Sequence, residues 1–194
     1  MSNKLLFFIG ILGVTFFGVA SFLGGFQFED YDPISQYISE TMAVDMPYGK
    51  SLRFYGYIPS GILLTIFAFV GYKKFPKSNL TKFGFWGLGI FYGIATILVG
   101  IFPCDKGCNK ELVDPSVSQL IHNLTALLTY LFVPISILMI SIGLWKSKKY
   151  IGLSKMGIIC VLICFVFIGF LSDPLTNYAG LFQRIIEGLS LIHI

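Results

Sequence analysis

The residues of this chain that could do acid–base or nucleophilic chemistry are few, and they lie near the ends of apolar stretches. His122 could act as a general base, because imidazole titrates near neutral pH and a carboxylate such as Asp105 or Asp173 would orient its ring. Arg184 could bind an anionic group, such as a lipid phosphate or carboxylate, through its planar guanidinium group. Ser39 could then be a nucleophile or a substrate contact.

The same residues have a purely structural interpretation. Arg184 could form an ion pair with Asp173 or with Glu187, which lies three residues further along the same helical face. His122 would then hydrogen-bond a loop, and the polar network would only fix helix packing. The sequence alone leaves both interpretations open.

Metal binding is a weaker hypothesis, because zinc takes three or four nitrogen, sulfur or oxygen ligands and the chain has only two histidines. His193 is expected near the opposite membrane face, so only His122 with two aspartates offers an alternative metal site. We therefore predict no metal ion and no cofactor. Cys104 and Cys108 could form a disulfide bond across a small loop, and the spacing leaves the bonded and free states open.

The elements that must position these residues are membrane-spanning helices. Of the 194 residues, 55% are hydrophobic and only 12% are charged, and the mean hydropathy is +0.79. A soluble domain cannot bury that much apolar surface. A helix of about 20 residues crosses a hydrocarbon layer of about 30 Å, and six windows meet that length. We predict one all-α transmembrane domain over residues 1–194, a six-helix bundle with helices at residues 5–24, 54–72, 83–103, 120–145, 156–172 and 178–194.

The loops predict the orientation. With the amino terminus inside, nine basic residues fall on the cytoplasmic side and four on the outer side, which is the asymmetry of the positive-inside rule. We therefore predict a multi-pass plasma-membrane protein with both termini in the cytoplasm, and no nucleic-acid partner despite the net charge of +4. The cytoplasmic lysines are Lys4, Lys73, Lys74, Lys77, Lys82, Lys146, Lys148, Lys149 and Lys155.

The outer loops are longer than closure requires, which is typical of functional segments. In residues 25–53, the spacing of Ile34, Tyr37, Ile38 and Met42 predicts a short amphipathic helix at the membrane interface. Within the helices, Pro59 and Pro134 predict kinks that either shape a cavity or are tolerated by packing. The glycines of the third helix, at positions 84, 87, 89 and 93, predict close helix contact.

Four short segments form a pattern: residues 31–40 (YDPISQYISE), residues 102–105 (FPCD), His122 at the start of helix four, and residues 180–184 (GLFQR). Together they resemble a bacterial and archaeal membrane-protein family known as domain of unknown function 998. The resemblance covers most of the chain and implies six helices in the family's order. It implies no activity, but it places Ser39, Glu40, Asp105, His122 and Arg184 in one outward-facing constellation. The cysteines around Asp105 depart from the family pattern.

We therefore expect an outward-facing polar pocket that binds or hydrolyses a lipid or small amphiphile, with membrane lipids as partners. Candidate catalytic residues are His122, Asp105 and Ser39, and candidate substrate-binding residues are Arg184, Asp173 and Glu40. A non-catalytic accessory protein and a small-solute transporter are the alternatives. Transport needs ionisable groups through both leaflets, and the cytoplasmic halves of the predicted helices carry few.

Overall fold

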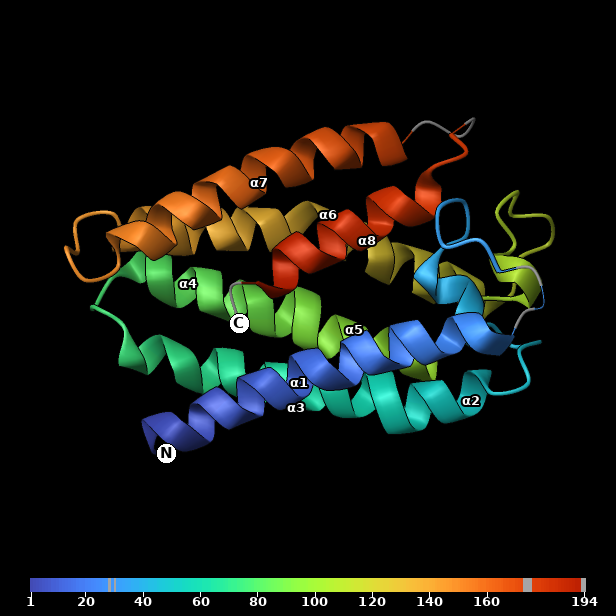
Figure 1. Cartoon of the computed structure of the whole chain (residues 1–194), viewed down its shortest axis with the longest axis horizontal. Coiled ribbons are helices and arrows are strands. Elements are labelled where there is room, and N and C mark those ends of the chain that lie inside the picture. Colours follow the sequence, from blue (N-terminus) through green and yellow to red (C-terminus); the bar gives the residue numbers. More distant parts are fainter. Residues whose placement is uncertain (28, 30, 173–175, 193–194) are drawn as a thin grey trace.

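The chain folds into a bundle of helices in this computed structural model, which describes residues 1–27, 29, 31–172 and 176–192 (Figure 1). All regular structure within those ranges is helical, as the sequence predicts. The α-helices are α1 (Asn3–Gly24), α2 (Gly49–Leu52), α3 (Ile58–Gly71), α4 (Asn79–Leu88), α5 (Ala95–Ile101), α6 (Val117–Leu144), α7 (Ile151–Leu171) and α8 (Ala179–Leu191). Short 3-10 or π turns are η1 (Gly25–Gln27), η2 (Ile38–Met42), η3 (Arg53–Tyr57), η4 (Tyr72–Lys74), η5 (Gly89–Ile94) and η6 (Lys106–Cys108).

Five continuous helical segments are long and apolar enough to cross a membrane. They are Asn3–Gln27, Gly49–Lys74, Asn79–Ile101, Val117–Leu144 and Ile151–Leu171. The second and third are composite, because α2, η3, α3 and η4 form one rod and α4, η5 and α5 form another. These segments correspond to the first five predicted helices, with ends that differ by a few residues. The chain therefore has the helices of a multi-pass membrane protein.

The sixth predicted helix is shorter than expected. Helix α8 has 13 residues, and at 1.5 Å per residue it extends about 20 Å, less than the roughly 30 Å of a hydrocarbon core. It packs against α7 and α6 and ends about midway along the bundle (Figure 1). A sixth span is thus not confirmed, and the predicted extension through His193 lies outside the described residues.

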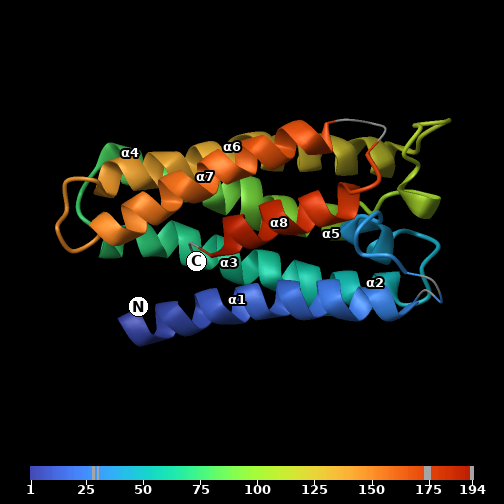
Figure 2. The ribbon, with the colours of Figure 1, turned by 45° about the horizontal axis from the view of Figure 1, so that its top comes forward.

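The two ends of the bundle differ in character (Figures 1 and 2). One end, called the lysine end here, holds the amino terminus and the short connections from α3 to α4 and from α6 to α7, at residues 72–78 and 145–150. The other end, called the loop end, holds the long connections at residues 25–48 and 102–116. All the candidate site residues that the structure describes lie toward the loop end.

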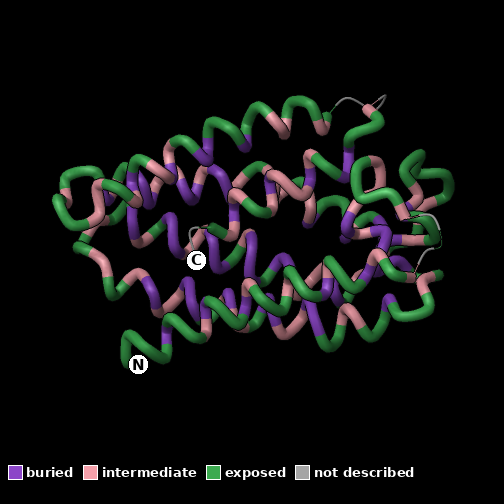
Figure 3. Tube along the Cα trace, viewed as in Figure 1, coloured by how far each residue is buried: buried purple, intermediate pink, exposed green. Residues whose placement is uncertain are grey.

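Burial follows the pattern of a bundle surrounded by lipid (Figure 3). The lysine half is closed by a cluster of large apolar side chains, among them Leu64, Phe85 and Ile137. The outer faces of α1, α6 and α7 expose apolar residues such as Phe8, Leu127 and Leu162 instead of polar ones. An apolar exterior of this extent needs a hydrocarbon environment rather than water.

Glycines allow the long helices to approach closely, as predicted. A Cβ added at Gly84 of α4 would lie 2.6 Å from the carbonyl oxygen of Ser136 in α6. One added at Gly93 of η5 would lie 2.8 Å from the backbone nitrogen of Thr65 in α3. Backbones this close tolerate no side chain, which is the usual role of small residues between membrane helices.

The π turns were not predicted, and both carry an inward-facing tyrosine. Segment η3 ends at Tyr57, just before Pro59 in the first turn of α3, and η5 contains Tyr92. A π turn adds a residue to one helical turn and thereby changes which side chain faces the interior. Tyr57 and Tyr92 are both buried, so these irregular turns direct two large polar side chains into the bundle.

The predicted interfacial helix in the first long loop is not confirmed. Among the described residues of this loop, η1 is followed by the five-residue η2, whose Ile38 and Met42 are buried against Ala20 and Tyr57 of the bundle. The apolar residues that suggested contact with a membrane surface contact the protein interior instead, while Ile34 is exposed. The first long loop therefore covers the loop end of the bundle.

Candidate functional site

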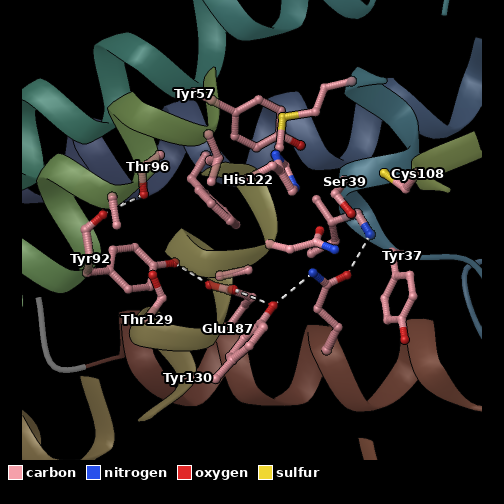
Figure 4. A pocket seen from close by; sticks show the side chains of 18 of the residues that line it. Tyr37, Ser39, Tyr57, Tyr92, Thr96, Cys108, His122, Thr129, Tyr130 and Glu187 are labelled. Atoms are coloured by element: carbon pink, nitrogen blue, oxygen red, sulfur yellow. Dashed lines mark hydrogen bonds between the residues drawn. The ribbon is translucent and has the colours of Figure 1, made fainter. Parts of the chain in front are cut away.

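A cavity of about 320 Å³ opens near the loop end of the bundle. Segments η2, η3, η5, α5, α6 and α8 all contribute to its wall, together with Phe17 of α1 (Figure 4). The aromatic lining residues are Phe17, Tyr37, Tyr57, Tyr92 and Tyr130, and the polar ones include Ser39, Thr96, His122, Asn123, Thr129, Gln183 and Glu187. Its size and its mixture of apolar walls with a few polar groups are typical of small-molecule sites.

Glu187 is the only acidic residue among the described residues that line the cavity. Tyr92 Oη donates a hydrogen bond to its Oε2 at 2.6 Å, and Tyr130 Oη lies 3.3 Å from its Oε1. Gln183, one turn earlier in α8, donates from Nε2 to Tyr130 Oη at 2.8 Å. Figure 4 shows Tyr92 of η5 and Tyr130 of α6 pointing toward Glu187 of α8. Together they form a hydrogen-bonded acidic centre inside the bundle.

His122 faces the same cavity and is anchored by the end of α5. Its Nδ1 lies 3.1 Å from the carbonyl oxygen of Phe102, which can only accept, so Nδ1 must carry the proton of this bond. In the neutral ring, Nε2 is then an acceptor, and it has no hydrogen-bond partner among the described residues. The structural interpretation predicted such a loop contact for His122.

The predicted catalytic group does not come together as a unit. Ser39 and His122 both line the cavity, but no hydrogen bond joins them in the described part of the chain. Asp105 does not line the cavity. Its carboxylate accepts hydrogen bonds from Ser116 Oγ at 2.6 Å and from Ser116 N at 2.9 Å, at the start of α6. A nucleophile bonded to a base that is in turn bonded to an acid, a common arrangement for covalent catalysis, is therefore not formed by Ser39, His122 and Asp105 in the described part of the chain.

Asp105 instead fastens the second long loop. The hydrogen bonds from Ser116 hold the pKa of its carboxyl below the ordinary value, so the group is ionised at neutral pH. Its backbone N–H donates to Gln119 Oε1 at 2.7 Å. A disulfide bond joins Cys104 to Cys108 on either side of Asp105, with 4.8 Å between their Cα atoms. These bonds place the loop beside the cavity opening.

Lys110 and Glu40 mark the mouth of the cavity. Lys110 Nζ lies 2.8 Å from Glu40 Oε1, and its ammonium group lies 5.1 Å from the ring centre of Tyr37. Glu40 is buried, and its carboxylate also accepts from Tyr37 N at 2.9 Å. Glu40 does not line the cavity, and its ion pair with Lys110 joins the two long loops.

Arg184 is separated from both the cavity and Glu187. Its Nη1 donates to the carbonyl oxygens of Pro33, Gln36 and Gly180 at 2.8 to 2.9 Å. Its Nη2 donates to the hydroxyl of Tyr31. The guanidinium group thus binds the first long loop to α8, and the predicted ion pair with Glu187 is absent from the described contacts. Asp173, the other proposed partner and ligand contact, lies outside the described residues.

No group of three His, Cys, Asp or Glu side chains suited to a metal ion occurs within the described ranges. His122 has one backbone partner and lines the same cavity as Glu187, and the other charged lining residue in the described ranges is the cation Lys110. The proposed alternative of His122 with two aspartates does not form from Asp105, whose carboxylate is bound to Ser116.

Residues 11–194 match the model of a family described as a protein of unknown function (DUF998). The chain belongs to this family. The predicted resemblance is thereby confirmed over nearly the whole sequence. No curated protein and no solved structure matches the chain.

The acidic centre of this DUF998 protein was missed by the sequence analysis. Glu187 was assigned to the face of Arg184, because residues three apart are neighbours on a helix. The structure turns Arg184 toward the loop and Glu187 toward Tyr92 and Tyr130. The available signal was an acidic residue within an apolar helix, which at membrane depth usually marks a functional site.

Proposed function

We propose that this protein binds a small amphiphile in the cavity that ends at Glu187, and that it does so from the outer face of the plasma membrane. The observation that carries the proposal is the composition of the cavity wall. Aromatic and aliphatic side chains such as Phe17, Tyr57 and Val99 offer an apolar surface, and Glu187 offers a polar group at its inner part. A ligand with an apolar part and a polar group complements both.

The orientation follows from charge. The two turns at the lysine end carry six of the nine lysines counted for the cytoplasmic side, and Lys4 of α1, Lys82 of α4 and Lys155 of α7 lie in the helix ends beside them. The positive-inside rule assigns that end to the cytoplasm, which leaves the loop end and the cavity mouth outside. We propose a cytoplasmic location for the amino terminus only, because α8, the last helix, ends midway along the bundle and not at the lysine end.

Binding accounts for the site better than hydrolysis or transport. Hydrolysis by Ser39 would need a hydrogen bond from its hydroxyl to a base, and none to Nε2 of His122 is present in the described part of the chain. Transport would need a polar route through the lysine half, where Leu64, Phe85 and Ile137 form a packed apolar cluster. These contacts support a cavity that is closed toward the cytoplasm.

Replacing Ala126 with tryptophan tests the proposal. Ala126 lines the cavity from α6, so an indole ring at this position would occupy the space of the ligand. We expect binding of 1-hexanol to weaken by at least about tenfold, because the bulk cannot be accommodated without displacing the ligand. Ligand-observed NMR on protein in lipid nanodiscs, corrected with empty nanodiscs, measures the affinity.

The matched control is Leu127→Trp, one residue further along α6 and exposed on the outer face of the bundle. It adds an indole ring in the lipid and should leave the affinity unchanged. If the wild type binds no more 1-hexanol than empty nanodiscs do, or if both variants bind as the wild type does, the proposed function is wrong.

A further inference from the structure

The hydrogen bonds around Glu187 have a fixed direction. Ile38 N donates to Gln183 Oε1 at 2.6 Å, which fixes the side-chain amide so that Nε2 faces Tyr130 Oη. Because the Tyr130 oxygen accepts that bond, its own proton is available to Glu187 Oε1. Tyr92 donates its proton to the other carboxylate oxygen. Two hydroxyl donors converge on Glu187, an arrangement that suits an anionic carboxylate.

This carboxylate lacks a positive partner in the described part of the chain. Among the described residues, Lys110 is the only Lys or Arg that lines the cavity, and it lies at the mouth, half-exposed and paired with Glu40. Arg184 is occupied by loop carbonyl groups. A carboxylate away from water without a cation is costly, and a cation supplied by a ligand would relieve that cost.

The other polar groups at this depth also present acceptors. Thr96 Oγ1 donates to the Tyr92 carbonyl at 2.7 Å, and Thr129 Oγ1 donates to the Thr125 carbonyl at 2.9 Å. Each hydroxyl has thus used its single donor within its own helix and retains lone pairs. His122 donates its Nδ1–H to the carbonyl oxygen of Phe102, and its Nε2 remains an acceptor. Asn123, whose Oδ1 accepts from Gln119, offers an amide donor toward the loop end.

From these three observations we infer that the ligand's inner polar group is a protonated primary or secondary amine, bound by Glu187. The inference rests on the proposed function, since it names the chemical class of the amphiphile in the same cavity. An alkylammonium group brings both the missing positive charge and N–H donors for the acceptors around it. Its alkyl chain would lie against the apolar wall that includes Tyr57 and Val99. A quaternary ammonium group has the charge but no donor.

Three ligands of equal chain length separate the contribution of the positive charge from that of the N–H donors: hexylammonium, hexyltrimethylammonium and 1-hexanol. We expect wild-type protein in nanodiscs at neutral pH to bind hexylammonium at least about tenfold more tightly than 1-hexanol, with the trimethyl compound in between. In Glu187→Gln the preference for hexylammonium should disappear while 1-hexanol still binds. Ligand-observed NMR titrations against empty nanodiscs give the affinities.

Glu40→Gln is the matched control, because Glu40 is a buried acid at the mouth that does not line the cavity. It should keep the wild-type preference. Equal wild-type affinity for all three ligands would overturn the amine assignment while leaving amphiphile binding intact, whereas no binding of any ligand would overturn the proposed function itself. Should Glu187→Gln not fold, the wild-type comparison alone decides, and Tyr92→Phe, which removes one donor to the carboxylate, should reduce the preference.

Discussion

Gly84→Ala is expected to lower the free energy of unfolding by about 2 to 3 kcal/mol, although it adds a single methyl group. The new Cβ would lie 2.6 Å from the carbonyl oxygen of Ser136 and 2.9 Å from the backbone nitrogen of Ile140. Both are backbone atoms of α6, so relief requires α4 and α6 to move apart. The midpoint of thermal unfolding in a fixed detergent should fall by several degrees.

The matched control is the same substitution at Gly18 of α1, where an added Cβ has no neighbour within 4 Å. Alanine is the better helix former, by up to about 1 kcal/mol, so Gly18→Ala should leave the midpoint unchanged or raise it. Equal effects at the two glycines would show that helix propensity, and not the contact between α4 and α6, governs the result.

Arg184→Met is expected to release the first long loop from α8. The substitution keeps an apolar stem of similar length but removes the donors that bind the carbonyls of Pro33, Gln36 and Gly180. Hydrogen bonds to a charged group contribute more than neutral ones, and we expect a loss of about 3 kcal/mol in the attachment of the loop. Amide hydrogen exchange of residues 32–40 should accelerate by at least about tenfold.

Lys110→Met provides the comparison for that experiment. It removes an ion pair whose lysine is 49% exposed, and such pairs contribute about 1 kcal/mol or less. Exchange in residues 32–40 should therefore change much less than in Arg184→Met. If Arg184→Met leaves the exchange rates of the loop unchanged, the hydrogen bonds to Arg184 do not hold it.

Much of the fold was predictable, because the cost of placing apolar side chains in water acts on every residue of a long segment. This explains why the first five predicted helices are found in the structure. The contacts of Gly84 and Gly93 were also predictable, since close helix packing in lipid favours small residues. The length of α8 was not predictable. The apolar pattern continues over residues 178–194, but the helix ends at Leu191.

The site was only partly predictable. Sequence patterns identified His122, Ser39 and Arg184 as residues toward the loop end, but they did not say which way each side chain points. A difference of three positions in α8 sends Arg184 to the loop and Glu187 to the cavity. The π turns that direct Tyr57 and Tyr92 inward have no clear sequence signal beyond Pro59 after the first of them. The tyrosine partners of Glu187 were therefore missed.

A cavity that takes up an amphiphile from outside the cell must be open to the outside and must be filled when the ligand binds. One labelling experiment measures both properties. A single cysteine at position 126 would be placed in a chain whose Cys160 and Cys164 are replaced by alanine, with Cys104 and Cys108 left bonded to each other. We predict that a membrane-impermeant thiol reagent labels this cysteine on intact cells and that hexylammonium slows the labelling. Labelling only after the cells are made permeable, or at a rate that neither hexylammonium nor 1-hexanol changes, would contradict the claim.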